Sequence, residues 1–499
     1  MIEYPSRKEA VFAAFAGITG VAGSYAVAGY TRSFVVAPID DLVVRATPGV
    51  IVSWVIQNIG DEGHYLHIAL SIAIAIGLLG ATALGGILVA RRLDRPFVGI
   101  GLVGLASWAL TVGITGEPVL AIGAAVPATV FAAAGSTPSI AEPDASRRRV
   151  LGASATAIGF TGLALGAGKT FSRSSVEIGD TVPGTEGEQG DEVSYSAEEL
   201  LAEAERAELD IAGEDVPGLV SPIGEFYNVD IAEFEPEVPA DEWSLTITGE
   251  VGTDTTITFE ELTERPVENR FTTLRCVGED RNERKMDNAI WTGTPIGPLL
   301  EEVDPDGECG CVMLRGEDGY YVQFPVEALE DGFIAWGMNG EPLPQSHGHP
   351  VRVLVPGHWG ETNVKWLNEI ELLDEEVDGY WEERGWQGTG PVNTVAKLWD
   401  DTVLDDGRIE VAGHAYAGTR GIERVEVSTD GGDSWNDAEL SDPLPGDDVW
   451  RQWRYVFEPD GSHEVVVRAV DGEGNLQTEE RSSSKPSGAT GWVSQTIEA

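Results

Sequence analysis

The sequence has little cysteine and few basic side chains, and each shortage argues against a class of protein. Three cysteines in 499 residues cannot form the disulfide framework of a small secreted domain. The sequence contains no haem-binding CxxCH motif and no cysteine set for an iron–sulfur cluster. Lys and Arg number 32 against 83 Asp and Glu, for a net charge of −51. Such a surface repels phosphate backbones, so nucleic acid is not an expected partner.

The negative charge is confined to one part of the chain. Residues 1–168 carry ten basic and ten acidic side chains, whereas residues 169–499 carry 22 and 73. The acidic part is also rich in Trp, Tyr and alternating Val and Ile, so most of it is expected to fold. Dense carboxylates keep a protein hydrated where salt screens its charges, which predicts a halophilic surface. This prediction concerns solubility and not activity.

Long apolar stretches predict an all-α transmembrane bundle over residues 1–168. Five of them approach the roughly 20 residues that cross a bilayer: residues 9–30, 63–90, 96–115, 117–135 and 150–168. A sixth, shorter stretch, Ala46–Ile59, is interpreted as interfacial or re-entrant. With five spans, the basic clusters at Arg7, Arg91 and Arg147 share one side, which the positive-inside rule assigns to the cytoplasm. The prediction is a multi-pass cell-membrane protein whose residues from 169 onward are extracytoplasmic.

The last span begins with an export-like motif. Ser146-Arg147-Arg148-Arg149-Val150-Leu151, before a Gly/Ala-rich apolar segment, is similar to a twin-arginine signal. The alternative is an ordinary basic flank of a span. Because no small-residue cleavage site is evident, we expect an uncleaved anchor.

Residues 169–220 are predicted to form an acidic linker that is mostly extended. Within it, SAEELLAEAERAEL begins with Ser196 and Glu199 at capping-box spacing and predicts one short helix. Cys309 and Cys311, in GECGCVML, would share one face of a strand and are interpreted as small buried core residues. A redox pair or metal site there would need further partners.

The remaining residues predict two domains of different class. Residues 221–394 mix short strands such as WSLTITGEV with helical pieces such as PIGPLLEEV, which is typical of an α+β domain. Residues 395–499 contain period-two strands such as IERVEVSTDGGDSW, which predict an immunoglobulin-like β-sandwich.

Several stretches of residues 221–499 follow the order found in the sulfite oxidase family. They are SPIGEFYNVDIAEF, FTTLRCVGEDR, GYYVQFPVEAL, MNGEPLPQSHGHPVRVLVPGHWG and VKWLNEIELLDEEVDGYWEERGW, with RGIERVEVSTDGGDSW in the sandwich. The chain resembles this family, and its apolar prefix resembles that of membrane-anchored prokaryotic members. The resemblance implies a sulfite oxidase-fold molybdopterin-binding domain at 221–394. It also implies a dimerisation domain at 395–499, and hence a homodimer.

The resemblance implies the molybdenum cofactor, molybdenum bound to molybdopterin, with Cys276 as its thiolate ligand. Molybdenum prefers soft sulfur donors, which suits this role. The residues implied to hold the cofactor are Glu225, Tyr227, Asn228, Val229, His347, Arg352, Asn363, Val364 and Lys365. The alternatives are an inert core thiol for Cys276, a core aromatic for Tyr227, a strand-surface arginine for Arg352 and a salt-bridged strand residue for Lys365.

The residues after Cys276 bear on the substrate. Sulfite-oxidising members have a small residue, Gly, Asn and two arginines there, whereas this chain has Val277-Gly278-Glu279-Asp280-Arg281. Two acids would weaken the binding of an anion by repulsion. Arg281, helped by Arg275 or Arg284, would restore a cation and is the second catalytic candidate.

The implied activity is oxygen-atom transfer on a small oxo-anion or sulfoxide, that is, an S-oxo or N-oxo substrate, in either direction. A redox partner protein or the quinone pool would exchange the electrons. The alternative function is a metal-free cell-surface binding protein that keeps the fold.

Overall fold

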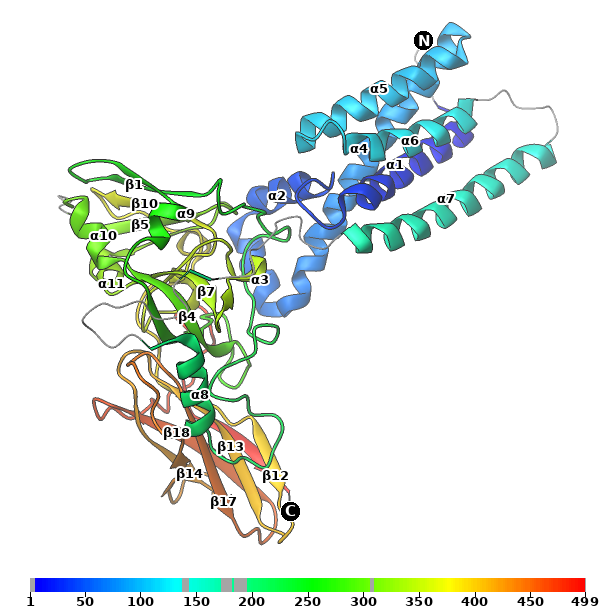
Figure 1. Cartoon of the computed structure of the whole chain (residues 1–499). Helices are drawn as coiled ribbons and strands as arrows, with labels where there is room; N and C mark the ends of the chain where they lie inside the picture. The colour runs from blue at the N-terminus through cyan, green and yellow to red at the C-terminus, as the bar shows by residue number, and fades with distance from the viewer. Residues whose placement is uncertain (1–4, 137–142, 172–181, 184–194, 306–308, 499) are drawn as a thin grey trace. The chain divides into compact units, whose positions relative to one another are not determined.

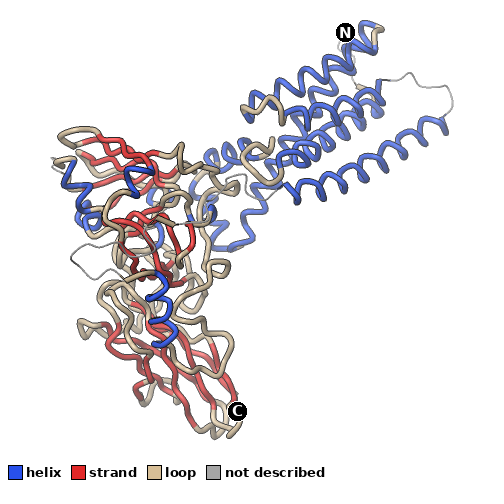
Figure 2. The backbone as a smooth tube through the Cα atoms, in the orientation of Figure 1, coloured by secondary structure: helices blue, strands red, loops and turns tan. Residues whose placement is uncertain are grey.

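The computed structural model of the chain describes residues 5–136, 143–171, 182–183, 195–305 and 309–498. The chain divides into two compact units, one of residues 1–176 and 232–237 and one of residues 177–231 and 238–499. Figure 2 shows that the first unit is built from helices and that the strands lie in the second. The segment 232–237 joins the first unit through Phe234, whose ring centroid lies 4.5 Å from that of Tyr30.

The first unit is a helical bundle. Its elements are α1 (Arg7–Ala28), α2 (Ala37–Ala46), α3 (Gly49–Asn58), η1 (Gly60–Gly63), α4 (His64–Leu93), α5 (Pro96–Thr115), α6 (Ala121–Ser136) and α7 (Pro143–Phe171). Figure 1 shows α1 running alongside α4 and α6. Small residues allow this close packing. A Cβ added at Gly17 would lie 2.2 Å from the Ile76 carbonyl oxygen, and one at Gly23 would lie 2.2 Å from that of Gly123.

Three helices of the described part, α1, α4 and α5, are long and apolar enough to cross a membrane. They match the expected spans 9–30, 63–90 and 96–115. The expected span 117–135 contains the shorter apolar helix α6, and 150–168 lies within α7. Length and composition therefore support three of the five expected spans. The stretch expected at the interface forms the short helix α3, which follows Pro48.

The larger unit contains an α+β part with two sheets. Its elements are β1 (Ser244–Gly249), β2 (Thr255–Thr258), α9 (Phe259–Thr263), β3 (Glu268–Arg275), β4 (Met286–Pro295), α10 (Gly297–Glu302), β5 (Cys311–Gly316), β6 (Tyr321–Pro325), α11 (Val326–Glu330), β7 (Phe333–Met338), β8 (Glu341–Pro342), η2 (Gln345–His347), β9 (Arg352–Leu354), η3 (Gly360–Thr362), β10 (Leu367–Leu373) and η4 (Glu382–Arg384). One sheet has the order β2-β1-β10-β5-β6, and the other has β3-β4-β7-β8 with β9 paired to β7. The predicted mixture of strands and short helices is confirmed.

The core of this part forms because buried apolar residues alternate with less buried residues along its strands. In β1, Leu245 and Ile247 are fully buried while the residues between and beside them are less so. β1 pairs in parallel with β10 and antiparallel with β2. The second sheet is buried along most of β4 and β7, and it positions the loop between β3 and β4 that carries Cys276.

The C-terminal part is a β-sandwich. Its strands are β11 (Val395–Ala396), β12 (Asp400–Val403), β13 (Ile409–Tyr416), β14 (Ile422–Ser428), β15 (Asn436–Asp437), β16 (Glu439–Leu440), β17 (Arg451–Phe457), β18 (His463–Asp471) and β19 (Val493–Ile497). The sheets have the orders β11-β13-β17-β16, with β12 on β13, and β15-β14-β18-β19. The immunoglobulin-like topology stays a prediction.

The short helix expected in the linker is confirmed as α8 (Ala197–Ala207). Ser196 accepts a hydrogen bond from the Glu199 N–H, and the Glu199 carboxylate accepts one from Ser196, which completes the predicted capping box. The chain after α8 is bound to the sandwich. The Leu209 N–H donates to Gln452, and Gln452 donates to the carbonyl of Pro217. The end of the linker is therefore ordered by the sandwich and not by its own composition.

The interpretation of Cys309 and Cys311 as small buried core residues is confirmed for Cys311, which is 4% exposed in β5, but it missed a bond between the two. The two form a disulfide, with their Cα atoms 5.2 Å apart. Gly310 between them has a positive φ of 61°, a conformation that glycine adopts without steric cost. The spacing of two was interpreted as a strand, but the glycine lets the chain turn before β5 begins at Cys311.

Candidate functional site

Cys276 lies at the point where β3 ends, at the start of the loop to β4. Its N–H donates to the Lys285 carbonyl at 2.9 Å, which closes the loop at its base. Among the described residues it is the free cysteine. Burial raises the pKa of its thiol to about 11, opposed by a hydrogen bond from the Gly278 backbone. A Cβ added at Gly278 would lie 3.6 Å from the Cys276 Sγ, so glycine leaves open the space beside the sulfur.

Tyr227 connects Cys276 with a buried arginine. Its pKa is raised well above the usual value by burial and then by Cys276, while Arg352 lowers it. Its N–H donates to Asp287 at 2.8 Å. Its hydroxyl lies against Gly360, where an added Cβ would be only 2.7 Å from the oxygen. Tyr227 is thus held by its N–H and packed at its hydroxyl, within electrostatic range of both Cys276 and Arg352.

Arg352 is a buried cation whose charge is not matched by a carboxylate. It is 3% exposed, and its Nη atoms donate to the carbonyls of His347 at 3.2 Å and Asn363 at 3.1 Å. Its guanidinium lies 5.0 Å from the Trp291 ring centroid. In the part of the chain that the structure describes, it forms no ion pair and its Nε has no partner. Burial lowers its pKa to about 10. A buried charge left unpaired is costly, which points to an anion at this place.

His347 and Lys365 lie beside Arg352. Burial, and then the charges of Arg352 and Lys365, lower the pKa of His347 to about 4, so its ring is neutral near pH 7. Its buried Nδ1 has no hydrogen-bond partner among the described residues. The Lys365 ammonium contacts Asp230 at 3.0 Å, and it donates to Asn228. Three predicted residues, His347, Arg352 and Lys365, therefore come together with Asn228.

The structure places the other predicted cofactor residues differently. The Asn363 side chain accepts from the Val355 N–H at 2.7 Å, so it supports the backbone, and only its carbonyl reaches Arg352. Val364 is 1% exposed and belongs to the core. Glu225 is exposed and Val229 is 46% exposed. Among the described residues, no hydrogen bond or ion pair joins the Glu225 side chain to the basic cluster.

The repulsion of an anion by Glu279 stays a prediction, but the structure pairs this carboxylate with two cations. Its carboxylate is fully buried and lies 2.7 Å from Arg275 Nε and 2.6 Å from Lys397 Nζ. Two cations therefore outweigh its charge. Asp280, by contrast, is exposed.

The three arginines in and beside the loop differ in the contacts that their side chains make. Arg275 is committed to Glu279, and Arg284 donates to the Trp399 carbonyl at 3.3 Å. The partly exposed side chain of Arg281 makes no hydrogen bond or ion pair with the residues that the structure describes. Of the three, Arg281 is the cation that remains available to a ligand.

Sequence reasoning missed Lys397, Glu361 and Glu382. The four carboxyl oxygens of the two glutamates are buried beside each other and near the Gly388 backbone. Burial and their mutual proximity raise the pKa of Glu361 well above normal, and burial raises that of Glu382. Glu361 also raises the pKa of Cys276, so the pair lies within electrostatic reach of the thiol. Only Lys397 carried a signal in the sequence, since a lone lysine in VAKLW interrupts an apolar run.

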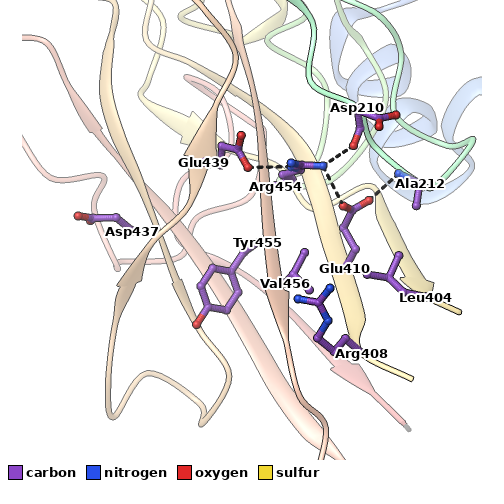
Figure 3. Close-up of a pocket in the computed structure, with 10 residues that line it drawn as sticks. All are labelled: Asp210, Ala212, Leu404, Arg408, Glu410, Asp437, Glu439, Arg454, Tyr455 and Val456. Atoms are coloured by element: carbon purple, nitrogen blue, oxygen red, sulfur yellow. Dashed lines mark hydrogen bonds and ion pairs between the residues drawn. The ribbon is translucent and has the colours of Figure 1, made fainter. Parts of the chain in front are cut away.

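A cleft of about 520 Å³ lies on the sandwich. Figure 3 shows Arg454 between Glu439 and Glu410 there. Its Nε lies 2.9 Å from Glu439, and Glu410 also accepts from the Ala212 N–H at 2.6 Å. Four acids and two arginines line the cleft, so it lacks the excess positive charge found around Arg352 and is not the candidate site for an anion.

Comparison with known proteins identifies both parts of the larger unit. Residues 232–381 match the family model of an oxidoreductase molybdopterin binding domain. Residues 391–485 match that of a Mo-co oxidoreductase dimerisation domain. These two domains are those of molybdopterin-dependent oxidoreductases.

The similar curated proteins are sulfite oxidases and nitrate reductases. The mitochondrial sulfite oxidase of Drosophila melanogaster is 30% identical over 304 residues, 49% of this chain and 53% of that protein. The Arabidopsis thaliana sulfite oxidase is 25% identical over 328 residues, 53% of this chain and 84% of that protein. The inducible nitrate reductase [NADH] 1 of Glycine max is 26% identical over 322 residues, 49% of this chain and 35% of that protein.

The chain belongs to the sulfite oxidase family of molybdopterin oxidoreductases. It spans about half the length of the mitochondrial sulfite oxidases that it matches. A crystal structure of the sulfane dehydrogenase SoxCD from Paracoccus pantotrophus has a TM-score of 0.49 at 19% identity, covering 64% of this chain and 97% of that chain.

Proposed function

We propose that this protein is a membrane-anchored molybdenum-cofactor oxidoreductase that transfers an oxygen atom to or from a small S-oxo or N-oxo substrate. The observation that carries the proposal is the buried charge of Arg352, which forms no ion pair with the residues that the structure describes, in the same domain as the free thiol of Cys276. A phosphate group would satisfy the guanidinium, because charge-assisted hydrogen bonds to phosphate offset its desolvation.

The residues present fit the cofactor. Two buried nitrogens without partners, Arg352 Nε and His347 Nδ1, would face its phosphate together with Lys365. Tyr227 and Asn228 would line the pterin, with Glu225 and Val229 at the exposed edge and the backbone at Asn363 and Val364 completing the site. Cys276 would provide the protein's thiolate to the metal. When bound, the molybdenum cofactor supplies the two-electron oxygen-atom transfer chemistry.

The chain's own residues would select the substrate. Arg281 would orient a small oxo-anion, since its side chain is free of ion pairs among the described residues. The charge of Glu279 is balanced by Arg275 and Lys397, so it does not oppose an anion. Both an oxo-anion such as sulfite and a neutral sulfoxide remain substrates of the proposed class. Electrons would pass to or from a redox partner protein or the quinone pool.

The N-terminal unit would anchor the enzyme in the cell membrane. The apolar helices α1, α4 and α5 and the basic clusters beside the spans support a multi-pass anchor with the catalytic domain outside. The twin-arginine-like motif supports export after cofactor loading. Changing Arg147 and Arg148 to Lys should trap the catalytic domain inside the cell, and unaffected export would contradict this route.

Metal analysis tests the proposed function. Protein from a cofactor-competent host should contain about one molybdenum per chain, and Cys276→Ser should lose it. The matched control is Cys309→Ser with Cys311→Ser, which removes the other cysteines and should keep the metal. Assays of sulfite oxidation and sulfoxide reduction at high salt then decide the direction. Wild-type protein without molybdenum would contradict the proposal and favour the metal-free binding protein.

A further inference from the structure

A single buried carboxylate, that of Glu279, lies within the loop that carries Cys276. Glu279 is fully buried, and its Oε1 accepts from Arg275 Nε at 2.7 Å and from Lys397 Nζ at 2.6 Å. Its Oε2 accepts from the Lys285 N–H at 3.0 Å, one residue before β4 begins. The carboxylate therefore bridges the two ends of the loop, and its second cation comes from the sandwich.

The backbone of Lys397 is held rigidly by that sandwich. Its N–H donates to the His414 carbonyl at 2.8 Å, and its carbonyl accepts from Trp453 Nε1 at 3.1 Å. It lies so close to β13 that a Cβ added at Gly413 would be 1.9 Å from the Lys397 carbonyl oxygen. The side chain is fully buried as well. A side chain with this support has little freedom to follow movements of the loop that it contacts.

Lys397 and its neighbour hold the loop at further points. The Lys397 ammonium donates to the Glu283 carbonyl at 2.7 Å. Asn282 donates to the Leu398 carbonyl at 2.7 Å and accepts from the Leu398 N–H at 2.9 Å. Residues 397–398 thus hold loop residues 279–283 through both side chain and backbone. Within the loop, the Glu279 N–H reaches the Cys276 carbonyl at 3.4 Å, so displacement of Glu279 reaches the cysteine directly.

We propose that Lys397 is a positioning residue for Cys276, which it holds in place from the sandwich through Glu279. The molybdopterin-binding domain then does not complete its metal-binding loop alone, and the C-terminal domain takes part in the site beyond any role in dimerisation. The inference rests on the proposed function in taking Cys276 as the metal ligand. The placement of the cysteine by Lys397 is testable without the metal.

The test measures how fast iodoacetamide alkylates Cys276 in the full-length chain in detergent, made without cofactor. The disulfide leaves Cys276 as the free thiol of the described chain, so alkylation reports on this loop. Lys397→Met should raise the rate at least about 10-fold, because loosening of the loop opens further access to the sulfur of this half-buried cysteine. Gly413→Ala should raise it as well, since the added methyl displaces the Lys397 carbonyl while every charge stays in place.

The control is Arg468→Met, which removes a 2.6 Å ion pair with Glu426 on the other sheet of the sandwich. It should lower the melting temperature without changing the alkylation rate. Glu279→Gln combined with Lys397→Met should be no faster than the faster single variant, because both act through one contact. Full additivity of the two, a wild-type rate in folded Lys397→Met, or an equal rise in Arg468→Met would each overturn the proposal.

The same preparations separate this inference from the proposed function. Molybdenum content of the wild-type chain from a cofactor-competent host tests the function and does not depend on Lys397. Alkylation of the cofactor-free chain tests the positioning role and does not depend on the metal. Wild-type protein without molybdenum, together with a fast Lys397→Met rate, would refute the function and leave the contact established.

Discussion

At the scale of single residues, Arg352 has the largest expected effect on the cofactor. Replacing it by Met removes the buried guanidinium and should weaken cofactor retention on the order of 100-fold, since each charge-assisted hydrogen bond contributes about 1.5–3 kcal/mol. Arg352→Lys keeps the charge but loses the planar set of donors. Its cofactor retention should therefore lie between those of the wild type and Arg352→Met. Molybdenum and molybdopterin per chain after dialysis measure the effect.

The matched control for Arg352 is Arg315→Met in the same domain. Arg315 is paired with Glu371 at 2.6 Å on the surface, and surface pairs contribute little. Its cofactor content should equal that of the wild type. Equal losses in both variants would indicate general instability instead of a phosphate contact.

Asp448 makes the stability depend on pH. It is 6% exposed and accepts from the Tyr416 hydroxyl at 2.5 Å, and burial raises its pKa from 3.8 to about 6. The folded state therefore binds this proton more tightly than the unfolded state. Its contribution is fully present below about pH 4 and is lost as the pH rises through about 6.

Asp448→Asn should remove this dependence, on the order of 2 kcal/mol between pH 4 and 7. Melting temperatures across this range measure the difference from the wild type. The exposed Asp241→Asn should leave the profile unchanged. A profile for Asp448→Asn parallel to that of the wild type would show that the carboxyl is ionised throughout.

At the scale of elements, η3 holds Tyr227 in place. An alanine Cβ at Gly360 would lie 2.7 Å from the Tyr227 hydroxyl and 3.1 Å from the Arg275 carbonyl oxygen. Gly360→Ala should cost about 1–3 kcal/mol through overpacking and lower cofactor content with it. The melting temperature and molybdenum content measure both effects.

Two variants show whether the Tyr227 hydroxyl causes this loss. Adding Tyr227→Phe to Gly360→Ala removes the hydroxyl and should recover part of the stability. Gly390→Ala is the control, because nothing lies within 4 Å of its added Cβ. If the double variant is no more stable than Gly360→Ala, the added methyl clashes with the Arg275 carbonyl and not with the Tyr227 hydroxyl.

The elements that sequence predicted well are those whose signals are local. The capping box at Ser196 and Glu199 and the alternation around Leu245 act within a few residues, so α8 and β1 follow directly. The disulfide at Cys309 was missed because it depends on the positive φ of Gly310, which residue spacing does not reveal. The resemblance identified the segment with Arg352 and Lys365, but it did not distinguish their basic side chains from that of Asn363, which supports the backbone.

At the scale of the whole molecule, the contacts that decide the site join distant parts of the chain. Glu279 and Lys397 are 118 residues apart, and no period or local motif links them. From the sequence alone, the charge of Glu279 is therefore expected to be uncompensated, whereas folding brings two cations into contact with its carboxylate. For the same reason the sequence identified the cofactor more surely than the substrate, which depends on the summed charge of residues brought together by folding.

The net charge predicts that salt stabilises this protein. All of the −51 lies in residues 169–499, so carboxylates on the larger unit repel one another at low ionic strength. Raising NaCl from 0.1 M to 1 M shortens the screening length from about 10 Å to about 3 Å, which weakens that repulsion. The melting temperature of the full chain in detergent should therefore rise by about 5 °C or more, since each kcal/mol is worth several degrees. Sucrose is the control, because it favours compact states without screening charge. A melting temperature that rises with sucrose but not with NaCl would show that the acidic surface serves a purpose other than stability in salt.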